Sequence, residues 1–262
     1  MAGRLPGVIL LGLVCTGILI LGWSHKPQIA NSAPSSPTPV PSDTVVATPA
    51  GGSVLDRMMR AWQAARSDHF TMQERSSTVT RTATTTFVGR DMGDVDWQNP
   101  PIFEMFSSGS QTKRTAKGVS VGIGQELQIY DQNLLAIRIG IHQWSCTHFF
   151  AISALPGTPF WDETAPFGVP GKNLGTSTIN GETTWHVRSV MTQKGPQGRG
   201  HPKWRVVRDY FAATATYLPM EIKIRSTAWN QTGTRAAQTT LRLSKFGESV
   251  HVTLPSACNN KK

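Results

Sequence analysis

An alternation of apolar and polar residues with a period of two recurs along the chain beyond residue 70, and it restricts the fold more than any other feature. Met220, Ile222 and Ile224, for example, alternate with charged neighbours. The same pattern places on apolar faces Leu127, Ile129, Leu135, Ile137, Ile139, Trp185, Val187, Trp204, Val206, Leu241, Leu243, Val250, Val252 and Leu254. Because successive side chains of a β-strand point to opposite faces, each stretch predicts a strand with one apolar face.

Turn-forming residues separate these stretches and predict antiparallel connections. The turns fall at residues 131–133, 180–181, 231–233 and 246–247. Residues 71–89 (TMQERSSTVTRTATTTFVG) are rich in Thr and predict a polar hairpin. We therefore expect a single antiparallel sheet with one apolar and one polar face. A sheet of roughly eight to eleven strands would curl.

One amphipathic helix is predicted ahead of the strands. Ser53 and Asp56 resemble a capping box, and the helix should end near Ser67. Its apolar stripe consists of Leu55, Met58, Met59, Trp62 and Ala65. One helix cannot cover so wide an apolar sheet face. Residues 149–168 (FFAISALPGTPFWDETAPFG) are therefore expected as a loop or short helices across the concave face.

Residues 5–23 form a run of 19 residues without a charged side chain, close to the roughly 20 that cross a bilayer as a helix. A signal-anchor helix fits this length best. A signal peptide cleaved after Ser24 is the second interpretation. A lipoprotein signal would use Cys15, but Val14 stands where a small residue is expected. All three place the remainder outside the cytoplasm, either held by a single-pass helix in the cell membrane or secreted after cleavage.

The domain boundaries follow from composition. Residues 1–24 are the anchor or signal, residues 25–52 a linker rich in Pro, Ser and Thr, residues 53–258 the folded domain, and residues 259–262 a tail. The formal net charge is +10 at pH 7. Outside the cytoplasm such a charge favours anionic lipid headgroups or cell-wall polymers over nucleic acid. A generally basic surface without one partner is the alternative.

Several short motifs resemble those of the LolA/LppX-like lipoprotein-carrier superfamily. They are the strands at residues 125–130 and 134–144, NGETTWHV at 180–187, YLPMEI at 217–222, and FGESVHV at 246–252 followed by Leu254-Pro255. The resemblance covers roughly residues 53–255, and the order of the motifs is what carries it. It implies an α+β fold, in which an unclosed half-barrel sheet carries helices on its concave face.

The resemblance also implies an apolar cavity between sheet and helices that takes acyl chains of lipids or lipoproteins. In this chain the expected lining is Leu127, Ile129, Leu135, Ile137, Trp185, Val187, Met220, Ile222 and Leu241, with Leu55, Met59 and Trp62 above it. A solid core of the same residues is the alternative. The other candidate function uses the same fold differently. The domain would then be a non-enzymatic sensor or scaffold that binds an envelope partner protein.

Two cysteines of the domain are expected to form a disulfide. Cys15 lies in the expected membrane span, which leaves Cys146 and Cys258. An even pair in an oxidising compartment usually bridges, and the bridge would secure the last strand. Two unpaired cysteines are the alternative.

No catalytic residue, metal site or cofactor is predicted. Residues 118–122 (GVSVG) match the nucleophile pattern G-x-S-x-G, but a strand rather than a helix should follow Ser120. His142 and His148 flank Cys146 and could suggest a metal, although polar strand ends near a disulfide explain them more simply. We therefore do not expect an enzyme.

Overall fold

The computed structural model describes residues 49–96, 102–131, 134–148, 170–193, 203–230 and 233–261. They form one 11-stranded antiparallel sheet with a helix before it and a short 3-10 helix after it. The sheet does not close on itself, so the predicted fold class of a single open sheet with an N-terminal helix is confirmed. The expected membrane span at residues 5–23 and the expected cover at residues 149–168 lie outside the described residues. Within them, no helix is long and apolar enough to span a membrane.

The elements follow one another in a simple order. The helix is α1 (Gly51–Ala65), and the 3-10 helix is η3 (Ser256–Lys261). The first six strands are β1 (Ser67–Thr80), β2 (Ala83–Asp96), β3 (Ile102–Thr115), β4 (Gly118–Asp131), β5 (Leu134–Ile139) and β6 (Ser145–His148). The other five are β7 (Gly171–Ile179), β8 (Glu182–Gln193), β9 (Lys203–Ala213), β10 (Pro219–Asn230) and β11 (Gly233–Ser244).

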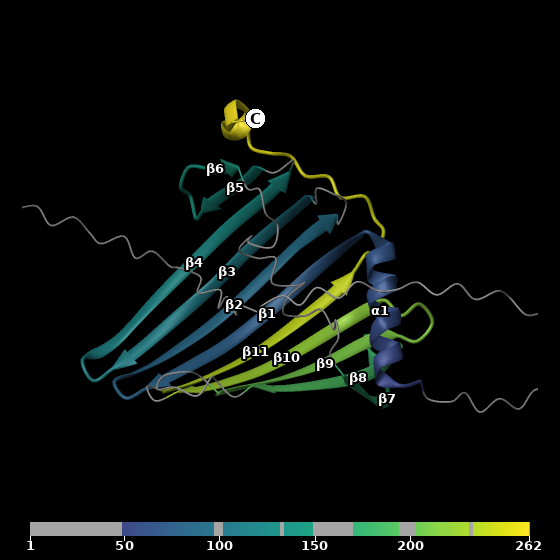
Figure 1. Cartoon of the computed structure of the whole chain (residues 1–262). Helices are drawn as coiled ribbons and strands as arrows, with labels where there is room; N and C mark the ends of the chain where they lie inside the picture. The colour runs from purple at the N-terminus through teal and green to yellow at the C-terminus, as the bar shows by residue number, and fades with distance from the viewer. Residues whose placement is uncertain are drawn as a thin grey trace, which may run out of the picture. The chain divides into compact units, whose positions relative to one another are not determined.

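Two runs of sequential strands meet in the middle of the sheet. The spatial order is β6-β5-β4-β3-β2-β1-β11-β10-β9-β8-β7 (Figure 1). Strands β1 and β11 therefore join the two runs, with His69 opposite Ser244 at one end and Thr80 opposite Gly233 at the other. Every strand pair is antiparallel, as the turns predicted.

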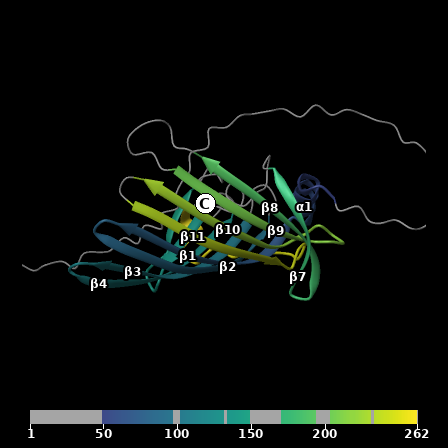
Figure 2. The same ribbon diagram turned by 90° about the horizontal axis from the view of Figure 1, so that it is seen from below.

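The two faces of the sheet differ. We call the face that α1 packs on the inner face and the opposite one the outer face. Helix α1 lies against β7, β8 and β9 at one end of the sheet (Figure 1). Figure 2 shows the same sheet from below as a curved, open layer. Since side chains alternate between faces, the strand register decides which residues can meet on each side.

Helix α1 is held by its apolar stripe and by one buried hydrogen bond. The stripe buries Leu55, Met58, Met59 and Trp62, as predicted. The Trp62 indole Nε1 donates to Asp68 Oδ2 at 2.7 Å, and both residues are buried. The helix begins at Gly51 rather than at Ser53, so the capping box is wrong. The Ser53 hydroxyl instead donates to the Ala50 carbonyl oxygen at 2.8 Å.

The early start of α1 depends on a close approach between two glycines. A Cβ on Gly51 would collide with the carbonyl oxygen of Gly171 in β7. Only glycine allows the helix to lie so close to the edge of the sheet.

Three strand predictions need correction. Residues 134–144 do not form one strand, because the chain turns at Gly140, whose φ is +56°, and returns as β6. Val250, Val252 and Leu254 lie outside the sheet, in a segment that forms neither helix nor strand. Strands β3 and β7 were not predicted. Gly and small polar residues occupy much of both, and they weaken the period-two pattern.

The predicted disulfide between Cys146 and Cys258 is present, and it joins β6 to η3 with a Cα–Cα distance of 5.6 Å. Both cysteines belong to a second apolar cluster, together with Ile129, Leu134, Ala136 and Leu254. The disulfide thus holds the segment after β11 against the far end of the sheet, as Figure 1 shows.

We predict that replacing both cysteines, Cys146→Ala with Cys258→Ala, lowers the free energy of unfolding by about 3–5 kcal/mol. The bond spans 112 residues, and opening it frees the unfolded chain from that constraint. Denaturant unfolding of the full chain in mild detergent measures the effect, with Cys15→Ser as the control. A loss below about 1 kcal/mol would show that the bridge adds little.

Candidate ligand-binding face

The inner face carries one continuous apolar cluster. Of the residues expected to line a ligand site, Leu55, Met59, Trp62, Leu135, Val187, Ile222 and Leu241 lie buried in this cluster, and Ile137 and Trp185 pack against it. Its other buried members are Val54, Met58, Phe70, Val95, Phe103, Met105, Tyr130, Tyr210, Ala212 and Leu243. The structure therefore brings nine of the twelve expected residues together.

Three expected residues lie elsewhere. Ile129 belongs to the second apolar cluster, which contains the disulfide and lies on the outer face. Leu127, two residues earlier on β4, points to the same side. It is Tyr130 that faces inward from β4. The sequence pattern was misleading here, because the end of β4 carries large side chains on both of its faces. Met220 is only half-buried and sits where the β9–β10 register shifts, and it belongs to neither cluster.

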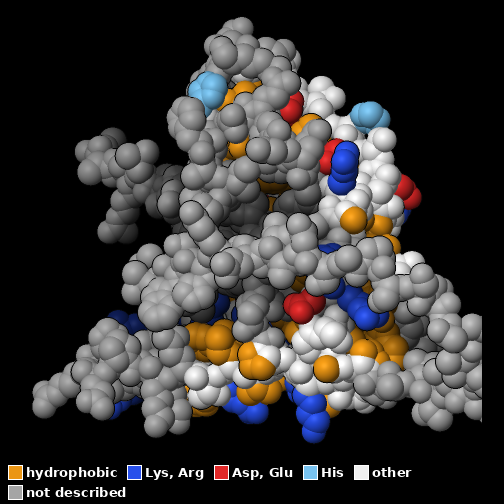
Figure 3. All heavy atoms as spheres, turned by 45° about the vertical axis from the view of Figure 1, so that its right-hand side comes forward, with side chains coloured by type: hydrophobic (Ala, Val, Ile, Leu, Met, Phe, Trp, Pro, Cys, Tyr) orange, Lys and Arg blue, Asp and Glu red, His pale blue; other side chains and the backbone are white. Residues whose placement is uncertain are grey.

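The apolar inner surface extends well beyond α1. The helix packs on β7, β8 and β9, whereas Phe70, Val95, Phe103, Met105 and Tyr130 come from β1 to β4. Phe103 and Tyr130 stack with ring centroids 5.5 Å apart. Hydrophobic side chains also reach the surface in the lower part of the view in Figure 3, with Lys and Arg along its lower border. Phe103 and Met105 were not among the expected lining residues, because Gly and small polar residues hide the strand pattern of β3.

A polar belt borders the apolar cluster on β1 to β4. Asp91, Ser107 and Glu126 stand opposite one another across β2, β3 and β4, and Glu74 lies on the same face of β1. The Gln128 side-chain amide donates to Glu126 Oε1 at 2.5 Å. Burial raises the pKa of Asp91 to about 6; a hydrogen bond from Ser107 opposes the rise, and the charges of Glu74 and Glu126 add to it.

A second polar group borders the cluster on β8 and β9. Tyr210 and Arg208 are buried on the inner face beside Ser189. Burial raises the pKa of Tyr210 to about 12, against the opposing influence of Arg208 and of the Ser189 hydroxyl. The inner face thus offers a wide apolar surface with carboxylates toward one side and a buried arginine toward the other.

The residues considered for catalysis and metal binding do not assemble into a site. Ser120 lies within strand β4 and is exposed, so no strand-to-helix turn presents it. Cys146 is bonded to Cys258. Within the described ranges, no three His, Cys, Asp or Glu side chains are grouped to hold a metal ion.

We predict that Asp91→Asn stabilises the protein at pH 8 by about 1–3 kcal/mol and leaves its stability at pH 4 nearly unchanged. The pKa of Asp91 is about 6 in the folded state and 3.8 in the reference state, so the folded protein binds the proton more tightly and loses stability as pH rises through 6. Denaturant unfolding between pH 4 and pH 8 measures the difference. Ser107→Ala removes the hydrogen bond that lowers the pKa of Asp91, so the loss of stability should extend to higher pH. Equal pH slopes for Asp91→Asn and wild type would contradict the assignment.

No protein-family model and no curated protein matches the sequence. Among solved structures, LprF from Mycobacterium bovis is similar at 14% identity and a TM-score of 0.42, over 79% of this chain and 98% of that one. A DUF1329 family protein from Desulfovibrio piger matches at 10% identity and a TM-score of 0.30, over 80% of this chain and 97% of that one. A domain described as an outer membrane lipoprotein-sorting protein, from Vibrio parahaemolyticus, matches at 10% identity and a TM-score of 0.26, over 80% and 97%. At these identities and TM-scores the likenesses carry no argument about family, role or ligand.

Proposed function

We propose that the domain binds acyl chains of a lipid or lipoprotein against the inner face of its sheet and carries no catalytic activity. One observation supports this most directly. The buried apolar cluster spans strands from both halves of the sheet, but α1 packs mainly on β7, β8 and β9. The apolar surface on β1 to β4 thus continues beyond the strands that the helix covers most, and an acyl chain is a ligand that would fit against it.

The chemistry of the inner face suits such a ligand. Each methylene that moves from water into an apolar site contributes about 0.8 kcal/mol, so a long chain against Phe70, Phe103 and Met105 would bind without any polar contact. The polar belt of Asp91, Ser107 and Glu126 would then mark where the chain ends. A polar group attached to the chain would meet these side chains.

We further propose that the domain works outside the cytoplasm, tethered by residues 5–23 or released after their cleavage. The disulfide supports an oxidising compartment, because such bonds are rare in reducing cytosol. The uncharged run at residues 5–23 supports the tether. A tethered carrier would exchange its ligand within reach of its own membrane.

The proposal predicts different outcomes for two large substitutions on the inner face. Val187→Trp should lower the free energy of unfolding by about 1–3 kcal/mol or more, because Val187 is fully buried beneath α1 beside Leu55 and Gly171. Met105 is 4% exposed and lies beyond the helix, and the proposal places an acyl chain beside it. Met105→Trp should therefore leave stability within about 1 kcal/mol of wild type and abolish binding of a fluorescent fatty acid. Denaturant unfolding and a fluorescence titration of the full chain measure both effects.

Phe106→Trp is the matched control for Met105→Trp. Phe106 is the next residue along β3, points to the outer face and is 38% exposed. The Phe106→Trp substitution should change neither the free energy of unfolding nor the binding of the fluorescent fatty acid. If Met105→Trp destabilises as strongly as Val187→Trp, and the purified protein carries no extractable lipid, the inner face is a filled core and the proposal fails.

A further inference from the structure

Basic and apolar side chains lie in register across the outer face. One row runs across eight strands through Val190, Val207, Arg225, Gln238, Arg75, Val88, Ser110 and Ile123. The neighbouring row runs through Arg188, Asp209, Lys223, Thr240, Gln73, Arg90, Ser108 and Gln125. At about 4.8 Å per strand, each row is roughly 34 Å long. These rows form a broad surface on the side opposite α1.

Two buried carboxylates organise part of this surface. Asp209 accepts from Arg188 Nε at 2.7 Å and from Arg225 Nη2 at 3.1 Å, and it also contacts His186. Burial would raise the pKa of Asp209, but hydrogen bonds from Arg188 and His186 and their charges outweigh it and hold that pKa below its ordinary value. Because the arginine side chains remain 40% and 53% exposed, Asp209 positions them without covering them.

Glu221 does the same for a second pair of cations. Its carboxylate contacts Lys223 Nζ at 2.7 Å and Arg242 Nε at 2.8 Å. Burial would raise the pKa of Glu221, but the hydrogen bonds and charges of Lys223 and Arg242 hold it below its ordinary value. Two acids thus fix four cations, which leaves net positive charge facing outward.

Three more arginines add to that excess. Arg75, Arg90 and Arg205 are exposed on the same face, and none of them has a carboxylate partner among the residues that the structure describes. We define the outer basic surface as these three residues together with Arg188, Lys223, Arg225 and Arg242. Among the described residues, Asp209 and Glu221 are the carboxylates that form ion pairs with members of this surface.

Exposed apolar side chains are concentrated on the same side. Eleven large hydrophobic residues of the described ranges are exposed, and the strand register places eight of them on the outer face. They are Val79, Val88, Phe106, Val119, Val121, Ile123, Val190 and Trp229. Ile123 is 77% exposed. Val119, Val121 and Ile123 follow one another on this face of β4, so part of the exposed apolar surface is contiguous, which is typical of an interaction site.

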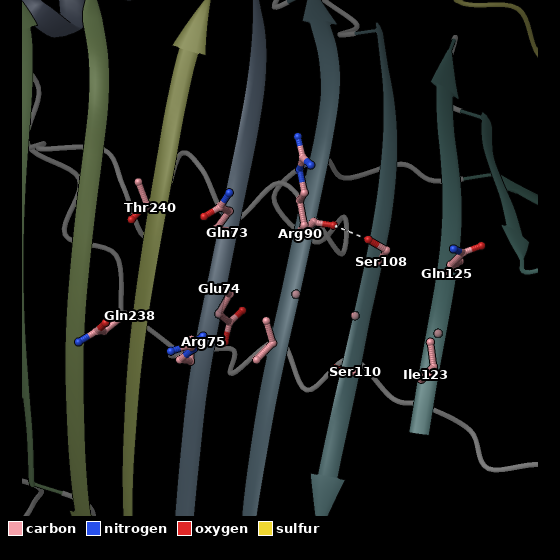
Figure 4. Close-up of a pocket in the computed structure, with 14 residues that line it drawn as sticks. Gln73, Glu74, Arg75, Arg90, Ser108, Ser110, Ile123, Gln125, Gln238 and Thr240 are labelled. Atoms are coloured by element: carbon pink, nitrogen blue, oxygen red, sulfur yellow. Dashed lines mark hydrogen bonds between the residues drawn. The ribbon is translucent and has the colours of Figure 1, made fainter. Parts of the chain in front are cut away.

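The surface contains two shallow hollows. The larger, about 570 Å³, is lined by Arg75, Arg90, Val88, Ile123 and neighbouring polar residues (Figure 4). The smaller, about 310 Å³, is lined by Arg188, Arg205, Arg225, Val190, Val207 and Thr227. In both, guanidinium groups and aliphatic side chains line the same hollow.

We infer that the outer basic surface docks onto the surface of a bilayer that contains anionic lipids. Arginines attract the headgroups, while exposed Val, Ile, Phe and Trp side chains can enter the interfacial layer. A free anion would use the arginines alone, and a nucleic acid would gain nothing from exposed aliphatic side chains. The inference does not depend on the acyl-chain proposal, because it concerns the opposite face of the sheet.

The test places a membrane-impermeant, polarity-sensitive thiol dye on the outer face. The full chain carries Cys15→Ser and Gln238→Cys, since Gln238 is exposed between Arg225 and Arg75. It is reconstituted in vesicles of phosphatidylcholine alone, or with roughly one third phosphatidylglycerol. The dye emission should shift to shorter wavelength in the anionic vesicles and return in about 0.5 M NaCl. A dye at Arg60→Cys on α1 should not respond.

Matched charge variants separate this surface from general electrostatic attraction. Neutralising three outer arginines should lower the ratio of docked to free domain roughly 100-fold, at about 1 kcal/mol for each charge. The outer variant is Arg75→Gln, Arg90→Gln and Arg205→Gln, and the control with the same charge change is Arg60→Gln, Arg66→Gln and Lys245→Gln. The control should dock as wild type does.

Four outcomes would overturn the inference. They are no shift in anionic vesicles, an equal loss in both charge variants, a shift produced by inorganic phosphate without vesicles, and a shift that grows with protein concentration without vesicles. The third would indicate an anion pocket, and the fourth an interface between two copies of the chain.

Discussion

The pairing of β1 with β11 is the contact on which the rest of the structure depends. It joins two runs of strands that would otherwise form separate sheets of six and five strands. The pairing is continuous from His69–Ser244 to Thr80–Gly233 and brings together residues more than 150 positions apart in the sequence. Forming it requires closure of a very long loop, so it cannot be an early local event.

The register of this central pair also keeps the two faces distinct. Leu241 and Leu243 stand opposite Met72 and Phe70 on the inner side, while Thr240 stands opposite Gln73 on the outer side. A slip by one residue would send every side chain of one half to the wrong face. The apolar cluster on the inner face and the outer basic surface therefore both depend on the register of this one strand pair.

The helix and many strands could be predicted because each depends on local pattern. The stripe from Leu55 to Trp62, the Asn180-Gly181 turn and the pairing of Cys146 with Cys258 all follow from neighbouring residues or from a count of cysteines. Strand order could not be predicted, because nothing local links β1 to β11. The inward direction of Tyr130 rather than Ile129 could not be predicted either, because β4 carries large side chains on both parities.

The disulfide also divides the chain mechanically. Strands β7 to β11 lie inside the covalent loop that Cys146 and Cys258 close, whereas α1 and β1 to β5 lie outside it. A tension applied between α1 and η3 passes through the first half of the domain and then through the sulfur–sulfur bond. It bypasses the 112-residue loop, which would be about 370–400 Å long if extended. A force that extends the first half of the domain is therefore not transmitted along the backbone of strands β7 to β11.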